Sequence, residues 1–243
     1  MMERARVLDA LRHSPLFAGL SREAIREVST ALMSQSWPAR RQILGRSDTT
    51  GRFFLVAEGR VKITRSNAHD GHDLTLWLLG PGDGFDIVSL LDGQPHDVSA
   101  WALDEVTTLS ASMALWQDWL ERFPSFRLAA HRYVARQLRE VSDLATDLAL
   151  HDTATRLAHL LLRHFDAPGP NLLHDLPQSE LASMIGSVRI VVSRVLARMK
   201  REAIVDLRDG RIRVSDLKRL LLRAEWHIGG RGGDESRAAR GKG

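Results

Sequence analysis

The pattern of apolar and polar positions changes along the chain. In residues 3–35, apolar residues recur at helical spacing, and Ser21 is a typical helix N-cap. Between residues 37 and 110, the pattern becomes short apolar runs separated by turn residues, as in residues 53–56 and 61–64. Such runs predict an all-β barrel or jelly roll that follows a helical N-terminal segment.

A long helix is predicted after the β region. Residues 112–123 have the pattern of a short helix, and Pro124 offers a start for a second helix. Nothing breaks this helix before about Leu150, which gives it a length of about 39 Å at 1.5 Å per residue. Its apolar positions alternate in steps of four and three residues, the 3.5-residue period of a coiled coil. We therefore expect a homodimer interface formed by Val134, Leu138, Val141, Ala145 and Leu148. Packing of the helix on its own domain is the alternative.

The most informative local pattern lies in the last third of the chain. Leu181 and Ile185 share one face of a first helix, and Gly186 suits a tight turn after it. Val192 and Leu196 form the apolar face of a second helix. This arrangement is typical of a helix-turn-helix motif, with an αα-hairpin that carries ordinary surface arginines as the alternative.

The second helix of this motif leaves several side chains outside its apolar face. Arginine can bond bidentately to the O6 and N7 acceptors of guanine, and aliphatic side chains can contact thymine methyl groups. Residues 204–214 form a hairpin pattern with Asp209 and Gly210 at the turn, placed like the wing of a winged helix. The expected DNA-binding residues are Arg189, Ile190, Val191, Ser193, Arg194, Arg198 and Arg211. Further candidate phosphate contacts are Lys200, Arg201, Lys218 and Arg219.

Composition and charge agree with this division of the chain. The 243 residues are 44% hydrophobic and 26% charged, which is enough for two globular domains. Residues 1–150 hold 17 Lys and Arg against 19 Asp and Glu, whereas residues 151–225 hold 13 against 9 and residues 226–243 hold 4 against 2. A basic rear half suits a chain that meets a polyanion, although this balance also occurs in proteins that bind no nucleic acid.

Several classes of protein and site are disfavoured by what the sequence lacks. It has no cysteine, which excludes disulfides, Cys-ligated zinc and iron–sulfur clusters. No apolar run approaches the roughly 18 residues of a membrane span, and no signal-peptide pattern is present, so we expect a cytoplasmic protein without a membrane partner. His69 and His72 are too few for a cupin-like metal site, so we expect neither a bound metal nor an enzyme.

Four segments carry a resemblance to a known family. Two of them lie in the β region. Residues 54–62 (FLVAEGRVK) look like a hairpin that is typical of this family, and residues 79–85 (LGPGDGF) look like its following turn. The others are residues 148–152 (LALHD), at a hinge, and residues 181–189 (LASMIGSVR), at the helix-turn-helix. In this order they resemble motifs of the CRP/FNR family of dimeric bacterial transcription regulators, over about residues 10–222.

The resemblance implies a fold class and a domain order. It implies an α+β protein with an N-terminal double-stranded β-helix or jelly roll, a long dimerisation helix and a C-terminal winged helix-turn-helix. The domains would be a cyclic-nucleotide-binding-like sensor at 1–124, the dimerisation helix at 125–151 and a DNA-binding domain at 152–225. Residues 226–243 have the composition of a disordered tail. The implied partners are a second copy of the chain, double-stranded DNA with an inverted-repeat operator, and RNA polymerase.

The positions that would hold cyclic AMP depart from the family pattern. Members that bind it carry a Gly-Glu pair for the ribose and an Arg-Ser/Thr pair for the phosphate, where this chain has Asp86-Ile87 and Val98-Ser99. An unneutralised buried phosphate would cost on the order of several kcal/mol, so we expect a small-molecule effector other than cyclic AMP. The expected effector pocket is formed by Phe85, Ile87, Val88, Val98, Ser99, Gln137, Leu138, Val141 and Ser142. A core filled by its own side chains is the alternative.

Two other functions stay open within the family. Haem-based gas sensing, known in some members, would need a histidine such as His96, although a lone loop histidine is usually solvated. DNA binding without any effector is the second alternative. The run at residues 189–194 (RIVVSR) is similar to the recognition helix of the global nitrogen regulators of cyanobacteria, but no arginine set for their effector, 2-oxoglutarate, is recognisable.

Overall fold

The chain forms two compact units, Met1–Ala149 and Leu150–Gly243. The predicted disordered tail at 226–243 lies outside the described residues, as does the predicted Asp-Gly hairpin turn at 209–210. Within the part of the chain that is described, no helix is long and apolar enough to cross a membrane. The computed structural model describes residues 2–46, 51–67, 72–165, 171–208 and 211–225.

The first unit opens with three helical segments: α1 (Met2–His13), η1 (Pro15–Phe17) and α2 (Arg22–Ala31). The Ser21 hydroxyl accepts a hydrogen bond from the N–H of Ala24 at 3.1 Å, which confirms the predicted N-cap. The prediction of helix up to residue 35 is wrong, because Met33 begins strand β1 (Met33–Trp37). β1 pairs with β8 (Val106–Ser112), and Met33 lies opposite Ser110. This long-range pairing overrides the local helical spacing.

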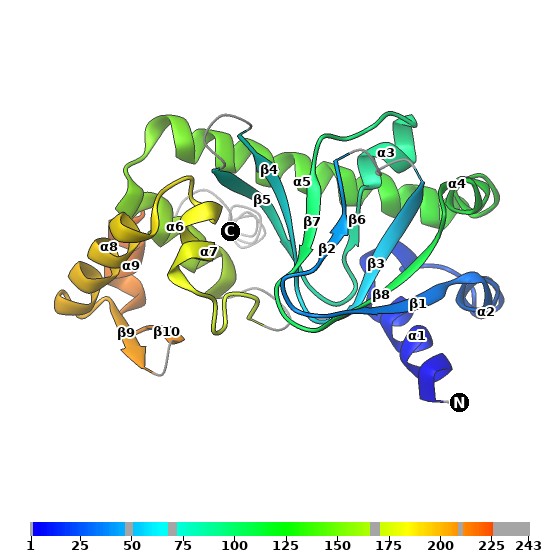
Figure 1. The fold of residues 1–243 in the computed structure, drawn as a ribbon, viewed down its shortest axis with the longest axis horizontal. Coiled ribbons are helices and arrows are strands. Elements are labelled where there is room, and N and C mark those ends of the chain that lie inside the picture. Colours follow the sequence, from blue (N-terminus) through cyan, green and yellow to red (C-terminus); the bar gives the residue numbers. More distant parts are fainter. Residues whose placement is uncertain (1, 47–50, 68–71, 166–170, 209–210, 226–243) are drawn as a thin grey trace, which may run out of the picture. The chain divides into compact units, whose positions relative to one another are not determined.

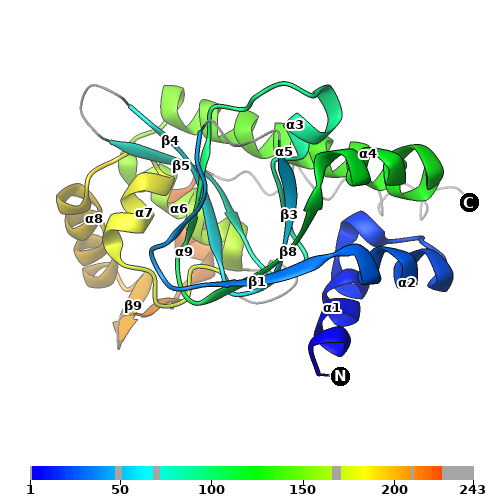
Figure 2. The same ribbon diagram turned by 45° about the vertical axis from the view of Figure 1, so that its right-hand side comes forward.

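Two four-stranded antiparallel sheets form the predicted jelly roll (Figures 1 and 2). The first has the order β1, β8, β3 (Arg52–Glu58), β6 (Gly84–Phe85). The second has the order β2 (Gln42–Leu44), β7 (Ser99–Ala102), β4 (Val61–Ser66), β5 (Asp73–Leu79). Successive side chains of a strand point to opposite faces. Phe53 of β3 therefore joins the core beneath the helices, where its ring lies 4.6 Å from that of Trp116, whereas Phe54 joins the core inside the roll.

Three further helices complete this unit: α3 (Ile87–Asp92), α4 (Met113–Arg122) and α5 (Pro124–Leu150). The predicted short helix and long helix are therefore both present. Tyr133 joins α5 to the roll, because its hydroxyl donates to the carbonyl of Gly84 at 2.8 Å and accepts from the N–H of Gly84 at 3.1 Å. Figure 2 shows α5 passing along the roll.

The turn between β3 and β4 requires glycine at position 59. Gly59 has φ +81°, and a Cβ there would lie 2.3 Å from the carbonyl oxygen of Glu105. Gly59→Ala should therefore lower the free energy of unfolding by about 2–5 kcal/mol, through backbone strain and an unavoidable clash. Urea unfolding followed by tryptophan fluorescence measures this loss.

Gly93 provides a matched control for this prediction. It also has a positive φ, +69°, but a Cβ at Gly93 would meet nothing within 4 Å. Gly93→Ala should cost only the left-handed backbone conformation, roughly 1–2 kcal/mol. Equal losses in the two variants would contradict the argument from the clash at Gly59.

The second unit contains four helices and a hairpin within its described residues. Asp152 caps α6 by accepting from the N–H of Thr155 at 2.7 Å, and this hydrogen bond lowers the pKa of the Asp152 carboxyl. α6 packs against α8 and α9, and α7 packs against α8. The elements are α6 (Thr153–Phe165), α7 (Gln178–Met184), α8 (Arg189–Arg201), β9 (Val205–Arg208), β10 (Arg211–Val214) and α9 (Leu217–Arg223).

Candidate nucleic-acid interface

Helix α8 has one buried face and one exposed face. Val192, Leu196 and Met199 are buried, with exposed fractions of 1% or less. On the other side Ile190 is 63% exposed, and Val191 is half-buried at the edge. The exposed side chains of the helix are Arg189, Ile190, Ser193, Arg194, Ala197, Arg198, Lys200 and Arg201. Apart from Val191, the residues of α8 that we predicted to bind DNA therefore share the solvent-facing side.

The turn before α8 places this face. Gly186 has φ +58°, and the N–H of Ser187 donates to the carbonyl of Ala182 at 2.9 Å, which closes the turn between α7 and α8. Val188 is the N-cap residue of α8 and forms no side-chain capping bond. The first N–H groups of α8 therefore remain available to an anionic group such as a DNA phosphate.

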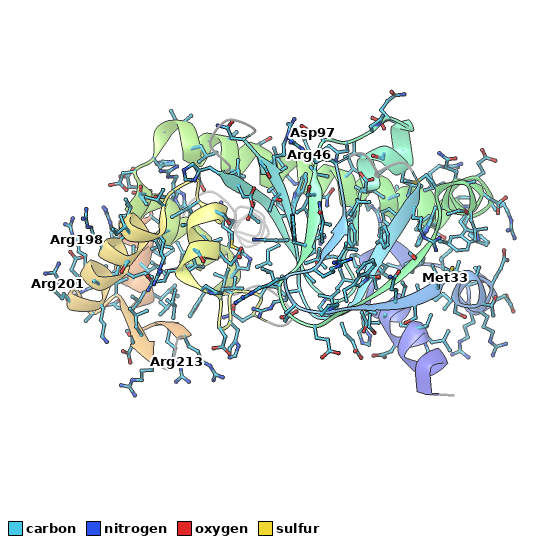
Figure 3. All side chains as sticks on the ribbon, viewed as in Figure 1. Met33, Arg46, Asp97, Arg198, Arg201 and Arg213 are labelled. Atoms are coloured by element: carbon cyan, nitrogen blue, oxygen red, sulfur yellow. The ribbon has the colours of Figure 1, made fainter. Side chains whose placement is uncertain are left out.

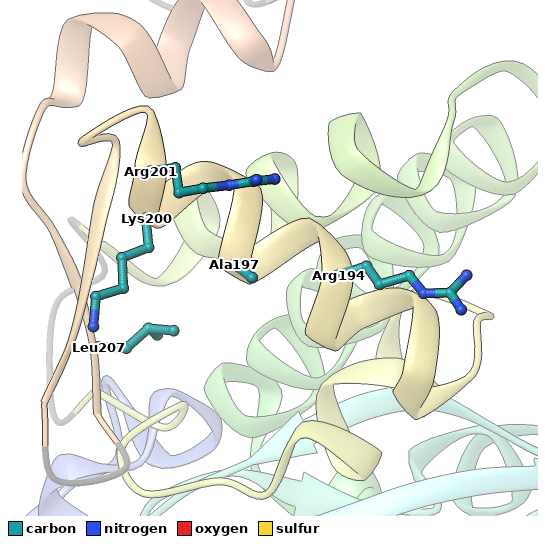
Figure 4. A pocket seen from close by; sticks show the side chains of 5 residues that line it. All are labelled: Arg194, Ala197, Lys200, Arg201 and Leu207. Atoms are coloured by element: carbon teal, nitrogen blue, oxygen red, sulfur yellow. The ribbon is translucent and has the colours of Figure 1, made fainter.

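A hollow of about 700 Å³ lies between α8 and the wing strand β9. Ala197 and Leu207 supply its apolar surface, and its cations are Arg194, Lys200 and Arg201. Figure 4 shows Lys200 extending beside the wing strand toward Leu207, whereas Arg194 extends from the N-terminal half of the helix. Cations around an open apolar surface suit a polyanion that also presents flat or methylated groups, as the edges of DNA do.

The cations of this unit fall into two groups. Arg189, Arg194, Lys200 and Arg201 make no ion pair within the described residues. Arg198 and Arg211, which we also predicted to bind DNA, are already paired. Arg198 Nε lies 2.8 Å from Glu202 Oε1, and this hydrogen bond lowers the pKa of Glu202.

The wing carries further arginines. β9 and β10 pair antiparallel, with Arg208 opposite Arg211. Arg211 Nε lies 3.1 Å from Asp175 Oδ1, 36 residues earlier in the chain. Arg213 is exposed on the same strand, and Figure 3 shows it together with Arg198 and Arg201 in this unit. The four cations without an ion pair, Arg189, Arg194, Lys200 and Arg201, therefore offer the stronger attraction for phosphate. Arg198 and Arg211 would first have to give up their carboxylate partners.

The residues predicted for a dimer interface lie along one side of α5. Leu138 is 65% exposed and Leu148 is 37% exposed. Ala145 is exposed, and Val134 and Val141 are half-buried. A row of exposed apolar side chains on one helix is a surface that gains free energy when a second apolar surface covers it.

The residues predicted for an effector pocket are divided between two cores. Phe85 and Val98 belong to the core inside the roll, whereas Ile87 belongs to the core beneath the helices. The ring of Phe85 stacks on that of Phe54, with centroids 5.0 Å apart. The buried members are Phe85, Ile87, Val98, Ser99 and Gln137, the half-buried ones are Val88 and Val141, and the exposed ones are Leu138 and Ser142.

Asp86 introduces a buried carboxylate beside these residues. Its side chain is fully buried, its backbone is left-handed with φ +69°, and its Oδ1 accepts from the Ser89 hydroxyl at 2.8 Å. Its Oδ2 has no hydrogen-bond partner among the described residues. His96 Nδ1 lies 3.7 Å from Oδ1, and the His96 ring lies 6.3 Å from that of Trp77. The side chain of His96 is 25% exposed, so this loop histidine is half-buried.

Two arginines near the expected phosphate position already hold a carboxylate. Arg46 Nε lies 2.5 Å from Asp97 Oδ1, and Arg65 lies 3.3 Å from Asp97 Oδ2. The hydrogen bond from Arg46 lowers the pKa of Asp97. Figure 3 shows Arg46 and Asp97 together on the first unit. Asp97 directly precedes Val98, so these cations face the chain's own anion.

Comparison with known proteins gives the family. A model for a cyclic nucleotide-binding domain matches residues 34–123, and one for a Crp-like helix-turn-helix domain matches residues 155–223. The cyclic AMP receptor protein of Thermus thermophilus is 32% identical over 210 residues, which cover 85% of this chain and 94% of the relative. The global nitrogen regulator of Synechococcus elongatus is 29% identical over 175 residues, which cover 69% and 78%.

The fold agrees with this relationship. A solved structure of a CooA mutant from Carboxydothermus hydrogenoformans superposes with a TM-score of 0.68 at 22% identity, and the match covers 80% of this chain and 88% of that chain. The relatives are transcription regulators rather than enzymes, as we expected for this chain. The exposed basic face of α8 thus belongs to a Crp-like helix-turn-helix domain. The chain belongs to the CRP/FNR family of DNA-binding transcription regulators.

Proposed function

We propose that the chain acts in the cytoplasm as a homodimeric, sequence-specific regulator that binds an inverted-repeat operator and works with RNA polymerase. The observation that carries this proposal is the exposed face of α8, where Arg189 and Arg194 make no ion pair within the described residues. Ile190 and Val191 would contact thymine methyl groups beside them. The proposed DNA-binding set is Arg189, Ile190, Val191, Ser193, Arg194, Arg198 and Arg211.

Selection of bound sequences from a random duplex library tests this function. If two α8 helices enter successive major grooves, the full-length protein should enrich an inverted repeat whose half-site centres lie about 10 base pairs, or about 34 Å, apart. An unenriched pool would contradict sequence-specific binding. Enrichment of a single half-site without a symmetric partner would contradict the homodimeric assignment.

We propose further that a small molecule other than cyclic AMP gates the regulator through the predicted pocket residues. Val98 is 2% exposed and carries no charge that could neutralise a phosphate. The fully buried side chain of Asp86 lies 3.7 Å from His96, which precedes Val98 by two residues. Bringing a cyclic phosphate to an apolar position without a cation costs free energy, because nothing compensates for the lost water.

Adding cyclic AMP should therefore leave the affinity for the selected operator unchanged. Fluorescence anisotropy of a labelled duplex, with and without the nucleotide, measures this. The variant that restores the missing cation, Val98→Arg, serves as the comparison. A shift of roughly tenfold in wild-type affinity, which is the ordinary size of effector coupling, would overturn the proposal about the effector while leaving DNA binding intact.

A further inference from the structure

A groove of about 460 Å³ runs between η1 and the first half of α5, away from the surfaces described above. Leu128 contributes apolar surface and is 50% exposed. Arg132 and Arg139 also line the groove and make no ion pair within the described residues. The other lining residues are Pro15, Ala18, Gly19, Ser125, Ala129, Tyr133 and Arg136.

The groove lies on the side of α5 opposite the proposed dimer interface. A helix turns by about 100° per residue, so side chains two positions apart point in nearly opposite directions. Arg132 lies two positions from Val134, and Arg139 lies two positions from Val141. Pairing of two α5 helices through the Val134 and Val141 side therefore leaves the two arginines accessible.

The turn at residues 82–83 holds both walls of the groove through hydrogen bonds to each wall. The buried Ser14 hydroxyl, at the start of η1, donates to the carbonyl of Gly82 at 2.6 Å. On the α5 side, Arg136 lies over the Tyr133 ring, 4.6 Å from its centroid, and its Nη2 lies 2.9 Å from Asp83 Oδ1. These contacts within the fold fix both walls of the groove, so a ligand would not have to order them.

We propose that this groove binds a small amphipathic anion, an organic molecule that carries a carboxylate, sulfonate or phosphate on an apolar body. Arg132 and Arg139 can each bond such a group through the planar guanidinium fork. Leu128 and the neighbouring apolar residues cover the body of the molecule. The volume lies within the range of about 300–1,000 Å³ that is common for sites of single small molecules.

Anilinonaphthalene sulfonate is a suitable probe, because it carries a sulfonate on an aromatic body and becomes fluorescent on leaving water. Titrated into the full-length protein without DNA, it should bind saturably. The double variant Arg132→Glu/Arg139→Glu should weaken binding by roughly tenfold or more, and Arg132→Gln/Arg139→Gln should weaken it less. The control Arg22→Glu/Arg26→Glu makes the same charge change on α2, outside the groove, and should leave binding unchanged. Circular dichroism checks that each variant is folded.

Competition identifies the class of ligand. Octanoate, a small amphipathic anion, should displace the probe at a single class of site, and poly-L-glutamate should not. Displacement by poly-L-glutamate alone would overturn the proposal in favour of an acidic protein partner. Absence of saturable binding, or equal losses in the groove variant and the α2 control, would overturn it as well. None of these outcomes depends on DNA binding.

Discussion

Arg194→Ala should weaken binding of the selected operator by about 1–3 kcal/mol and should relax the preference at one base position in each half-site. The side chain is exposed on α8, borders the hollow beside the wing, and makes no ion pair within the described residues. The whole guanidinium fork is thus available to a guanine edge. Anisotropy titrations against a panel of single-base operator variants, at one salt concentration, measure both effects.

Two further variants separate base recognition from simple loss of charge. Arg198→Ala removes an arginine that is paired with Glu202, so it should weaken all operator variants evenly and by less than Arg194→Ala. Arg22→Ala removes a cation from α2 in the other unit and should leave the binding profile unchanged. An Arg194→Ala protein with the wild-type base preference would remove this residue from the proposed recognition set.

Leu138→Glu should dissociate the proposed dimer and reduce operator affinity by roughly 100-fold or more. Leu138 is 65% exposed on α5, and a carboxylate facing its own symmetry mate would lose apolar contact and add like-charge repulsion. Each released subunit would then bind one half-site without the gain from joining two sites on one duplex. Sedimentation equilibrium measures the association, and anisotropy measures the affinity for DNA.

Met33→Glu is the matched control, because Met33 is a similarly exposed apolar residue at 62% but lies on β1 rather than α5. It should leave both the association state and the DNA affinity at the wild-type values. A Leu138→Glu protein that remains dimeric would show that α5 does not form the interface through this side.

Local patterns predicted much of the fold. The 3.5-residue period identified α5, and Ser21 was predicted as an N-cap, because caps and helix faces depend on residues within a turn or two. Met33 was assigned to a helix, because its strand depends on pairing with Ser110, far along the chain. The left-handed start of α3 at Asp86 was not predicted either, since a non-glycine residue gives no local signal for a positive φ.

In the candidate site, too, local sequence patterns predicted some features, whereas tertiary contacts determine others. Helical periodicity alone places Arg189 and Arg194 outside the buried face of α8. Arg198 and Glu202 are four residues apart on one helix, so the sequence allows an i,i+4 ion pair that our predictions did not include. The pairing of Arg211 with Asp175 depends on tertiary structure and has no local signal. The same holds for Leu207, which borders the hollow from another element.

The predicted effector residues show the limit of sequence proximity. Phe85 and Ile87 are two positions apart, yet they belong to different cores, because a strand ends and a helix begins between them. Proximity in the sequence therefore does not determine which core a side chain joins. The groove between η1 and α5 joins segments more than 100 residues apart, and only the folded chain brings them together.

A specificity ratio tests most directly whether α8 reads DNA sequence. The affinity of the wild-type protein for its selected inverted repeat is compared, at one salt concentration, with that for a duplex of equal length and composition whose half-sites are scrambled. We predict that the inverted repeat binds about 10³-fold or more tightly. Equal affinities for the two duplexes would contradict sequence reading by α8.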